Sequence, residues 1–246
     1  MQPAEGSRRF RRRRLSAIVA LVVIAVGVGS YASTFTAIFG ASTIRVEGQH
    51  RIGAAQVQRL AGLETGVNVF HLDTAAAERK LEADPRVLTA SVSTDLPSTV
   101  LVTITERLPV AVVGQATGSS DLIGTDGVVI GPATGNEQLP MISAADEASL
   151  ETDALRSGAA AAGAMSVGLR GQVKSMVVRT DGSLELELRS GVTASLGQPS
   201  EISQKGQALE GVLQWAAGQG RILESVDVSV ASAPTATLVG GAVLTP

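Results

Sequence analysis

The chain opens with a long run of residues that carry no charge. This run covers residues 15–44, and its most apolar part covers residues 15–28. A helix that crosses a bilayer needs about 20 predominantly apolar residues, and this run supplies them. Aromatic side chains favour the membrane–water interface, and those that follow the apolar part are Tyr31, Phe35 and Phe39. The pattern predicts a transmembrane helix over residues 15–40.

A cluster of arginines lies immediately before this run. Its members are Arg8, Arg9, Arg11, Arg12, Arg13 and Arg14. Because positive charge is retained on the cytoplasmic side, we expect residues 1–14 to form a cytoplasmic tail and the rest of the chain to lie outside. A cleaved signal peptide is the alternative, since Ser30 and Ala32 offer small residues at the spacing that cleavage requires. The apolar run is longer than a usual signal core, which favours a retained anchor.

Alternating polarity after the run predicts a first folded unit over residues 43–111. Residues 44–48 alternate apolar and charged side chains, as in a half-buried strand. A short amphipathic helix follows over residues 54–61. A second helix begins at Asp73, whose carboxylate can cap the free amides of its first turn.

Two more strands complete this unit. Pro85 ends the second helix, because a proline disfavours helical geometry in the residue before it. Residues 88–92 and 100–104 then carry apolar side chains at their even positions. The resulting order of strand, helix, helix, strand and strand predicts a small sheet that two helices cover on one face.

The turn, capping and periodicity signals over residues 112–240 predict a second folded unit of mixed helix and strand. Asp126-Gly127 and Asp181-Gly182 have the composition of hairpin turns. Ser143 and Asp146 have the spacing of a capping box that starts a helix over about 144–167. A further helix carries apolar residues at helical spacing from Ile202 to Ala216. The expected strands are 172–180, 183–188, 192–196 and 226–230. The fold class is therefore α+β with a mostly antiparallel second sheet, followed by a tail over 241–246.

Composition limits the chemistry open to this chain. Hydrophobic residues make up 44% and aromatic residues only 2%, so aliphatic side chains must build the core. With no cysteine, a disulfide framework or thiolate metal site is excluded. Beyond residue 14, the chain carries 14 Lys and Arg against 22 Asp and Glu. This acidic balance argues against binding nucleic acid.

Residues with catalytic potential are few and scattered. His71 lies two residues from Asp73, but neither a third metal ligand nor a nucleophile accompanies them. Glu78 and Glu82 are interpreted as part of a solvated helix face. Trp215 lies at helical spacing from core positions, which indicates the edge of a core. No nucleophile elbow or phosphate-binding loop is present. We therefore predict no catalytic site, metal, cofactor or small-molecule substrate.

Several short sequence motifs, in their order along the chain, resemble those of a known family. In the first unit they are residues 66–70, 81–87, 96–97 and 104–111, and in the second 139–142, Gly197, Lys205 and 226–228. The first unit resembles a POTRA domain, and the motifs resemble those of the FtsQ/DivIB family of bacterial division proteins. Gly124 departs from the family, which usually has an acidic residue there. The resemblance covers almost the whole chain and weakens after Ala231.

The resemblance implies a non-enzymatic divisome scaffold in the cytoplasmic membrane at the division septum. Such a scaffold binds FtsB-like and FtsL-like single-pass proteins and links early and late division proteins to septal peptidoglycan synthesis. Strand addition at an exposed sheet edge is the expected mode, and 235–239 is short, apolar and uncharged. The predicted partner-binding residues are Val226, Val228, Val230, Pro234, Thr235, Ala236, Thr237, Leu238 and Val239. A disordered C-terminal tail is the alternative.

Two other functions are open. POTRA units also occur in polypeptide transport, but nothing after residue 111 alternates as the strands of a membrane barrel do. A secreted hydrolase behind a cleaved signal peptide is the second alternative, and the absence of a catalytic motif argues against it.

Overall fold

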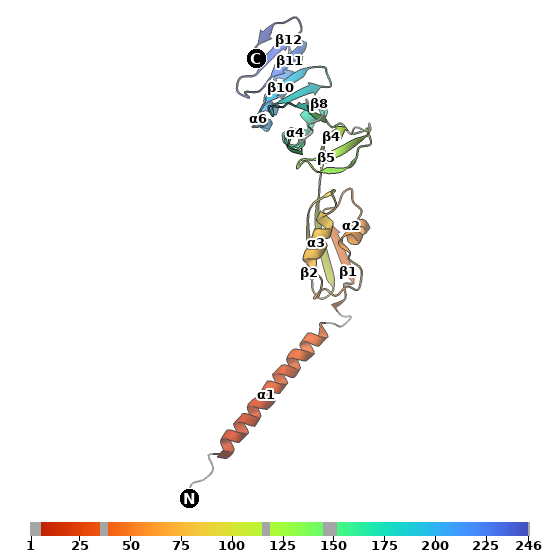
Figure 1. Ribbon diagram of the computed structural model, residues 1–246, viewed down its shortest axis with the longest axis vertical. Coiled ribbons are helices and arrows are strands. Elements are labelled where there is room, and N and C mark those ends of the chain that lie inside the picture. Colours follow the sequence, from red (N-terminus) through yellow and green to blue (C-terminus); the bar gives the residue numbers. More distant parts are fainter. Residues whose placement is uncertain (1–5, 35–38, 115–118, 145–151, 246) are drawn as a thin grey trace. The chain divides into compact units, whose positions relative to one another are not determined.

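The computed structural model describes residues 6–34, 39–114, 119–144 and 152–245. The chain divides into two compact units, Met1–Glu106 and Arg107–Pro246 (Figure 1). We expected the boundary after residue 111. The strand that begins at Pro109 pairs within the sheet of the second unit, so residues 107–111 belong there.

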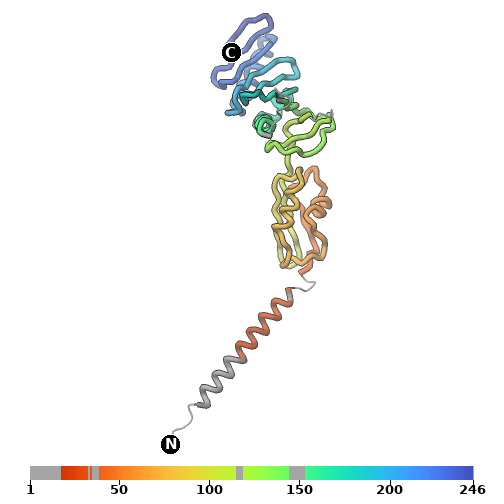
Figure 2. Tube along the Cα trace, viewed as in Figure 1, coloured from red at the N-terminus to blue at the C-terminus, as the bar shows by residue number. Residues whose placement is uncertain are grey.

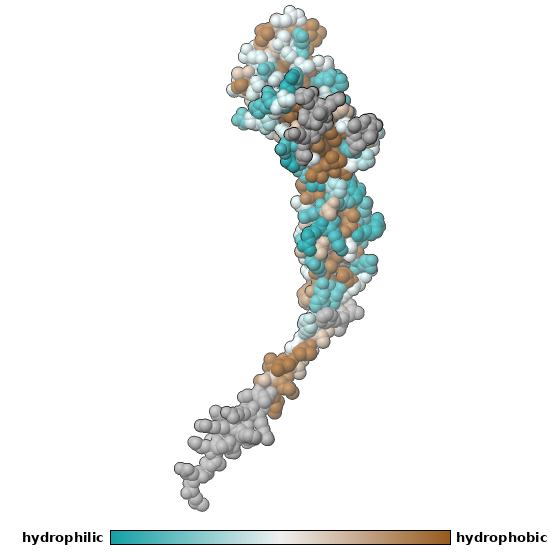
Figure 3. Space-filling model, in the orientation of Figure 1, coloured by the Kyte–Doolittle hydropathy of each residue, from teal (hydrophilic) through white to brown (hydrophobic). Residues whose placement is uncertain are grey.

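Helix α1 spans Gly6–Ser33, so it begins earlier and ends earlier than the predicted span. Residues 35–38, which that prediction included, lie outside the described part. Figure 3 shows apolar residues on the visible face of the described part of α1. The large apolar side chains exposed on this helix are Ile18, Val19, Leu21, Val22, Val23, Ile24, Val26, Val28 and Tyr31. Over the ranges given above, no helix combines the length and the hydropathy that a membrane span requires.

Beyond α1, the described part of the first unit contains a three-stranded sheet and two helices. In chain order these elements are β1 (Thr43–Glu47), α2 (Ala54–Ala61), α3 (Thr74–Glu82), β2 (Val87–Asp95) and β3 (Thr99–Glu106). The sheet order is β1-β3-β2, with β1 parallel and β2 antiparallel to β3. The predicted order of elements is confirmed. Asp73 caps α3 as expected, since its Oδ1 accepts the N–H of Ala76 at 2.8 Å.

The strands β2 and β3 of this unit follow the predicted alternation except at the start of β2. Val100, Val102 and Ile104 of β3 are buried as expected. In β2 the pairing shifts between Val87 and Thr89, so Val87 faces the core while Leu88 is 42% exposed. A bulge reverses the side-chain alternation, which explains why the prediction for residue 88 was wrong.

The segment over residues 66–70 packs on the core through an aliphatic side chain. Val69 is the buried residue of this segment, while Phe70 is 46% exposed. The ring of Phe70 meets that of Phe39 edge-on, with their centroids 4.8 Å apart. Gly40 bridges Asn68, so the first unit begins before residue 43.

An ion pair fixes the turn after α3. The carboxylate of Asp84 accepts the backbone N–H of Arg86 at 2.9 Å and the Nη2 of the same residue at 2.6 Å. The hydrogen bond from the Arg86 side chain lowers the pKa of Asp84, although burial opposes this shift. Asp84 and Arg86 thus hold the chain as it passes from α3 into β2.

The second unit contains one long sheet. Its strands are β4 (Pro109–Gly114), β5 (Ser120–Gly124), β6 (Val129–Pro132), β7 (Met141–Ala144), β8 (Val173–Val178), β9 (Leu184–Leu188), β10 (Thr193–Gly197), β11 (Leu223–Asp227), β12 (Thr235–Leu238) and β13 (Val243–Leu244). They lie in the order β13-β12-β11-β10-β9-β8-β7-β4-β5-β6. The sheet is mixed, because β10–β11, β4–β7 and β7–β8 pair in parallel and the other described pairs are antiparallel.

Three helices pack against this sheet: α4 (Thr152–Ala164), α5 (Val167–Gln172) and α6 (Ile202–Gly218). The predicted helix over 144–167 was wrong in its start and its continuity. Ser143 lies in β7, because this segment pairs with β8, and Asp146 lies outside the described residues. Ser166 starts a separate helix, since its Oγ accepts the N–H of Leu169 at 2.9 Å. The predicted helix ending near Ala216 is confirmed as α6.

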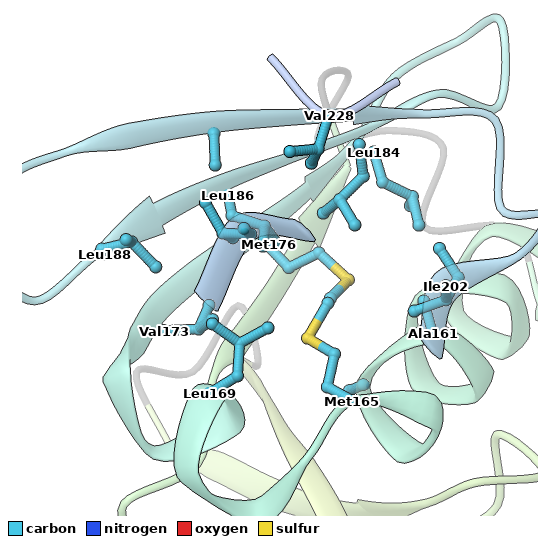
Figure 4. Packing of buried hydrophobic residues seen from close by; sticks show 14 of the residues in the cluster. Ala161, Met165, Leu169, Val173, Met176, Leu184, Leu186, Leu188, Ile202 and Val228 are labelled. Carbon is cyan, nitrogen blue, oxygen red and sulfur yellow. The ribbon is translucent and has the colours of Figure 1, made fainter. Parts of the chain in front are cut away.

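Aliphatic residues and methionines fill the core of the second unit, which has very few aromatics. Met165 and Met176 point toward one another in the middle of the packed side chains, with Leu169 and Leu186 nearby (Figure 4). Flexible thioethers fill irregular space that branched side chains leave. Trp215 is only partly buried and packs at the edge of this core, as predicted.

Both predicted Asp-Gly turns are confirmed. Gly127 and Gly182 have φ of +79° and +80°, a conformation that glycine adopts without steric cost. The loop around Gly182 closes through its N–H, which donates to the carbonyl of Arg179 at 2.9 Å.

Candidate partner-binding site

The candidate site is the end of the long sheet formed by β11, β12 and β13, to which five of the predicted partner-binding residues belong. β11 pairs in parallel with β10 and antiparallel with β12. The side chains of Val226 and Val228 are 2% and 0% exposed and pack in the core. These two residues therefore support the sheet from within and offer no side chain at its surface.

A short loop connects β11 to β12. The N–H of Ser229 donates to Asp227 Oδ1 at 2.8 Å, and the N–H of Ala233 donates to the carbonyl of Val230 at 3.1 Å. These two bonds turn the chain back beside β11. Val230 lies in this loop and is 58% exposed, whereas Pro234 is half-buried at the start of β12. Val230 is thus outside the strand to which we assigned it.

β12 alternates between the core and the surface. Ala236 and Leu238 are buried, while Thr235 and Thr237 are half-exposed on the opposite face. Val239 follows the strand and is 65% exposed; its N–H donates to the carbonyl of Ile222 at 3.0 Å. Ile222 is itself 73% exposed, so these two apolar side chains lie together at one end of β12.

β12 does not form the end of the sheet. The chain folds back after Val239, and β13 pairs antiparallel with β12 through Ala236↔Leu244 and Thr237↔Val243 (Figure 2). The predicted tail over residues 241–246 contains this strand, and the described part of the chain ends at residue 245. The adjacent glycines 240 and 241 were the available signal for a hairpin.

The hairpin between β12 and β13 closes through two backbone bonds. The N–H of Leu238 donates to the carbonyl of Ala242, and the N–H of Gly241 donates to the carbonyl of Leu238, both at 2.9 Å. Gly240 and Gly241 have φ of +107° and +88°, which favours glycine at both positions. Backbone hydrogen bonds therefore hold β13 beside β12.

No ionisable side chain lies on β12 or β13. The neighbouring β11 carries the exposed Glu224 and Asp227, and farther along the sheet Glu187 of β9 accepts from Lys174 at 2.7 Å and from Ser175 at 3.1 Å. The Lys174 hydrogen bond, followed by that of Ser175, lowers the pKa of Glu187. The last two strands of the sheet, β12 and β13, are thus neutral.

The first unit has a strand edge that is closed in another way. The N–H of Val92 donates to Glu78 at 2.8 Å, and the N–H of Ala90 donates to Glu82 at 3.1 Å. Both acceptors are side chains of α3, and both donors belong to β2 at the side of the sheet. Glu78 and Glu82 therefore satisfy backbone amides, although Glu82 is exposed and Glu78 is half-buried, so the solvated helix face that we predicted has a structural role as well.

Besides Glu78 and Glu82, a third glutamate of the first unit accepts backbone N–H groups, and this one is buried. Glu106 is 7% exposed and accepts the backbone N–H groups of His50, Arg51 and Ile52 at 2.7–2.9 Å. Burial raises the pKa of Glu106, but the three backbone bonds together outweigh it, and the pKa lies below its usual value. Sequence reasoning missed this contact, because Glu106 and its three donors lie more than 50 positions apart.

Other candidates for chemistry have structural partners. His71 Nε2 lies 3.4 Å from Thr34 Oγ1, and Lys205 is buried with its Nζ donating to the carbonyl of Gln198 at 2.7 Å. In the part of the chain given above, no group of three or more His, Cys, Asp or Glu side chains is placed to hold a metal ion. A groove of about 510 Å³ between α4 and the start of α6 is lined mainly by small residues, such as Ala160 and Ala164.

Gly124, where the chain departs from the family pattern, lies beneath an arginine. A Cβ at this position would come within 2.5 Å of Arg107 Cδ. The Nε of Arg107 donates to Asp126 Oδ2 at 3.0 Å. The carboxylate that pairs with this guanidinium thus lies two residues after Gly124. The glycine therefore leaves room for the arginine stem above the turn.

Comparison with known proteins follows the two units. The first matches the model "POTRA domain, FtsQ-type" over residues 39–107, and the second matches "Cell division protein FtsQ/DivIB, C-terminal" over residues 111–229. Cell division protein FtsQ of Corynebacterium glutamicum is 31% identical over 58% of this chain and 64% of its own length. That of Streptomyces collinus is 26% identical over 96% of this chain and 92% of its own length.

Two further facts limit these likenesses. The matches to the first three relatives span less than two thirds of those relatives' own length. The solved extracytoplasmic domain of DivIB from Geobacillus stearothermophilus is 12% identical over 46% of this chain and 93% of that one, with a TM-score of 0.35. On the two family models and the relatives named FtsQ, the chain belongs to the FtsQ/DivIB family of bacterial cell-division proteins.

Proposed function

We propose that the chain is a non-enzymatic scaffold of the division machinery whose extracytoplasmic part binds FtsB-like and FtsL-like single-pass proteins. In this proposal it links early and late division proteins to septal peptidoglycan synthesis at the division septum. The observation that carries the proposal is the neutral strand β12 near the end of the long sheet, beside the exposed Ile222 and Val239.

Strand addition is the binding mode that this geometry favours. A partner segment in extended form would pair its backbone with β12 and continue the sheet. Neutral side chains at the edge add no desolvation cost, because no charge has to leave water there. Thr235, Thr237 and Val239 would then contact the partner through their side chains, while Ala236 and Leu238 keep the strand seated on the core.

The other predicted residues have a supporting role in this proposal. Val226 and Val228 lie in and beyond β11, beneath the proposed contact, and Pro234 sets the start of β12. Val230, exposed in the loop before β12, lies at the far end of the strand from Val239. A partner strand longer than β12 would reach it.

We further propose that residues 15–40 anchor the protein in the cytoplasmic membrane, with residues 1–14 in the cytoplasm. The arginine cluster and the uncharged run support this orientation. The apolar side chains of α1 that the structure describes are more than half exposed on every side of the helix. Apolar surface is stabilised by about 25 cal/mol for each Å² removed from water, so such a helix requires a lipid or protein surrounding.

Site-directed cross-linking tests the partner-binding proposal, because the chain has no native cysteine. A full chain carrying Val239→Cys, derivatised with a photo-reactive group, should cross-link to the extracytoplasmic segment of an FtsB-like protein. Val129→Cys is the matched control, since Val129 is a partly exposed valine on β6 at the other end of the same sheet. Equal labelling from both positions, or none from Val239, would contradict the proposal.

Depletion tests the cellular role. Cells that lose this protein should grow as undivided filaments, and a copy with Val239→Asp and Ile222→Asp should fail to restore septation while remaining folded. Normal septation after depletion would rule out the scaffold role. An intact N-terminal tag that only a cytoplasmic protease can reach would support the proposed anchor, and a tag removed by signal cleavage would contradict it.

A further inference from the structure

We infer that β13 is a displaceable cover over β12, so that a partner strand must remove it before it can pair with the sheet. The inference rests on the proposed function, because it describes regulation of the same edge. It assigns a role to the segment after Gly241.

The first observation is the position of the cover. β13 pairs with Ala236 and Thr237, which are the two central residues of β12. An incoming strand cannot pair with these residues while β13 is in place, because each edge of a strand accommodates one neighbour. The cover and a partner segment would therefore compete for the same backbone groups.

The second observation is the small size of the cover. β13 has two residues, of which Val243 is 65% and Leu244 is 36% exposed. On its other side β12 pairs with β11 over four positions and buries Ala236 and Leu238. Segments with few buried apolar contacts open at low free-energy cost, so β13 should detach while β12 remains on the sheet.

The third observation concerns the occupant. Leu244 lies opposite Ala236, on the face of the sheet that carries the core, whereas Val243 lies opposite the half-exposed Thr237. A partner strand that continues this pattern would place an apolar residue opposite Ala236 and a neutral residue opposite Thr237. A segment that pairs with all of β12 would make more contacts than the two-residue cover and would displace it.

A measurable consequence follows for affinity. When only a fraction of the protein is open, the apparent Kd is the intrinsic value divided by that fraction. A cover that is closed nine-tenths of the time weakens binding about tenfold.

The test compares three forms of the full chain. The first is unaltered, the second ends at Gly241, and the third carries Thr237→Cys and Val243→Cys to lock β13 on β12 by a disulfide. The probe is the extracytoplasmic segment of an FtsB-like protein, and its binding is measured by titration. We expect the shortened chain to bind several-fold more tightly, and the locked chain to lose binding until a reductant restores it.

A matched lock controls for the disulfide itself. The β9–β10 hairpin closes through the same pair of backbone bonds, since the N–H of Leu188 donates to the carbonyl of Val192 and the N–H of Gly191 donates to the carbonyl of Leu188. Thr193 and Glu187 face each other there as Thr237 and Val243 do in the last hairpin. Glu187→Cys with Thr193→Cys should leave binding unchanged. A locked cover that binds as well as its reduced form overturns the inference, as does a shortened chain that binds less well.

Hydrogen exchange separates this inference from the proposed function. In the chain without partner, the amide of Leu238, bonded to Ala242, should exchange at least tenfold faster than the amide of Leu188, bonded to Val192. Equal protection would overturn the displaceable cover whether or not any partner binds. Fast exchange at Leu238, with no binding by any of the three forms, would support the cover and reject the proposed partner.

Discussion

In the first unit, the amides of Ala90 and Val92 at the side of β2 donate to glutamate carboxylates of α3, whereas in the second unit β12 is covered by the backbone of β13. A carboxylate satisfies an amide without presenting a new strand edge, so the side of β2 is closed to pairing. A backbone cover reproduces the geometry of a partner strand and can be exchanged for one. The two sheets thus differ in what each can bind. A role in polypeptide transport would require a peptide to pair with an open strand edge, and the carboxylates beside β2 disfavour such pairing there.

The largest effect is expected when a carboxylate that satisfies several amides is removed. Glu106→Ala leaves three buried or half-buried N–H groups without an acceptor, and we expect the first unit to lose about 3 kcal/mol of stability. Denaturant unfolding of the purified full chain, followed by a probe in the first unit, measures this loss. Glu64→Ala is the control, because Glu64 is an exposed glutamate of the same unit. A loss no larger than that of the control would contradict the role of Glu106.

Removing the carboxylates beside β2 should open a new edge. The double variant Glu78→Ala, Glu82→Ala should cost about 1–2 kcal/mol and should produce concentration-dependent self-association. Sedimentation of the purified chain detects this association, with Glu47→Ala on β1 as a control. A variant that stays at the oligomeric state of the parent chain would show that these carboxylates do not protect the edge.

Acid should weaken the first unit through Glu106. Its folded-state pKa lies below the usual value near 4.5, so its contribution is fully present above pH 4.5 and is lost as the pH falls through the lowered pKa. We expect the unfolding free energy to fall more steeply in the parent chain than in Glu106→Gln between pH 5 and pH 3. Parallel pH dependences in the two proteins would refute this assignment.

The smallest effect is expected from removal of β13. A chain that ends at Gly241 should lose less than about 1 kcal/mol of unfolding free energy, because the two residues of β13 bury little surface. Thermal unfolding of the second unit measures this change. A loss of several kcal/mol would mean that β13 is a structural strand, and the contrast with β2 would disappear.

Local patterns in the sequence predicted much of the fold. Asp73 at the start of α3, Gly127 and Gly182 in their turns, and Val100, Val102 and Ile104 in β3 were each identified from neighbouring residues. The family was identified from short sequence motifs in order. Helix capping, positive φ and strand alternation each depend on residues only a few positions apart, so the sequence alone reveals them.

Features that depend on distant residues were missed. Leu88 turned outward because β2 shifts its register against β3, and a register is a property of two strands. The helix expected from Ala144 gave way to β7, because pairing with β8 outweighs a local capping signal. Glu78 and Glu82 look solvated on a helical wheel, and only the adjacent β2 gives them donors.

For the candidate site, the sequence by itself determined a neutral, apolar strand at residues 235–238 and two glycines after it. The tertiary structure alone decided that Val226 and Val228 face the core and that β13 covers β12. The physical reason is that alternation defines the two faces of a strand, whereas its edges are defined by which backbone comes to lie beside it. Any strand can satisfy the backbone groups of an edge, whatever its side chains. The alternation of apolar and polar residues therefore does not reveal which strand lies there, and the tertiary structure was needed to place β13 beside β12.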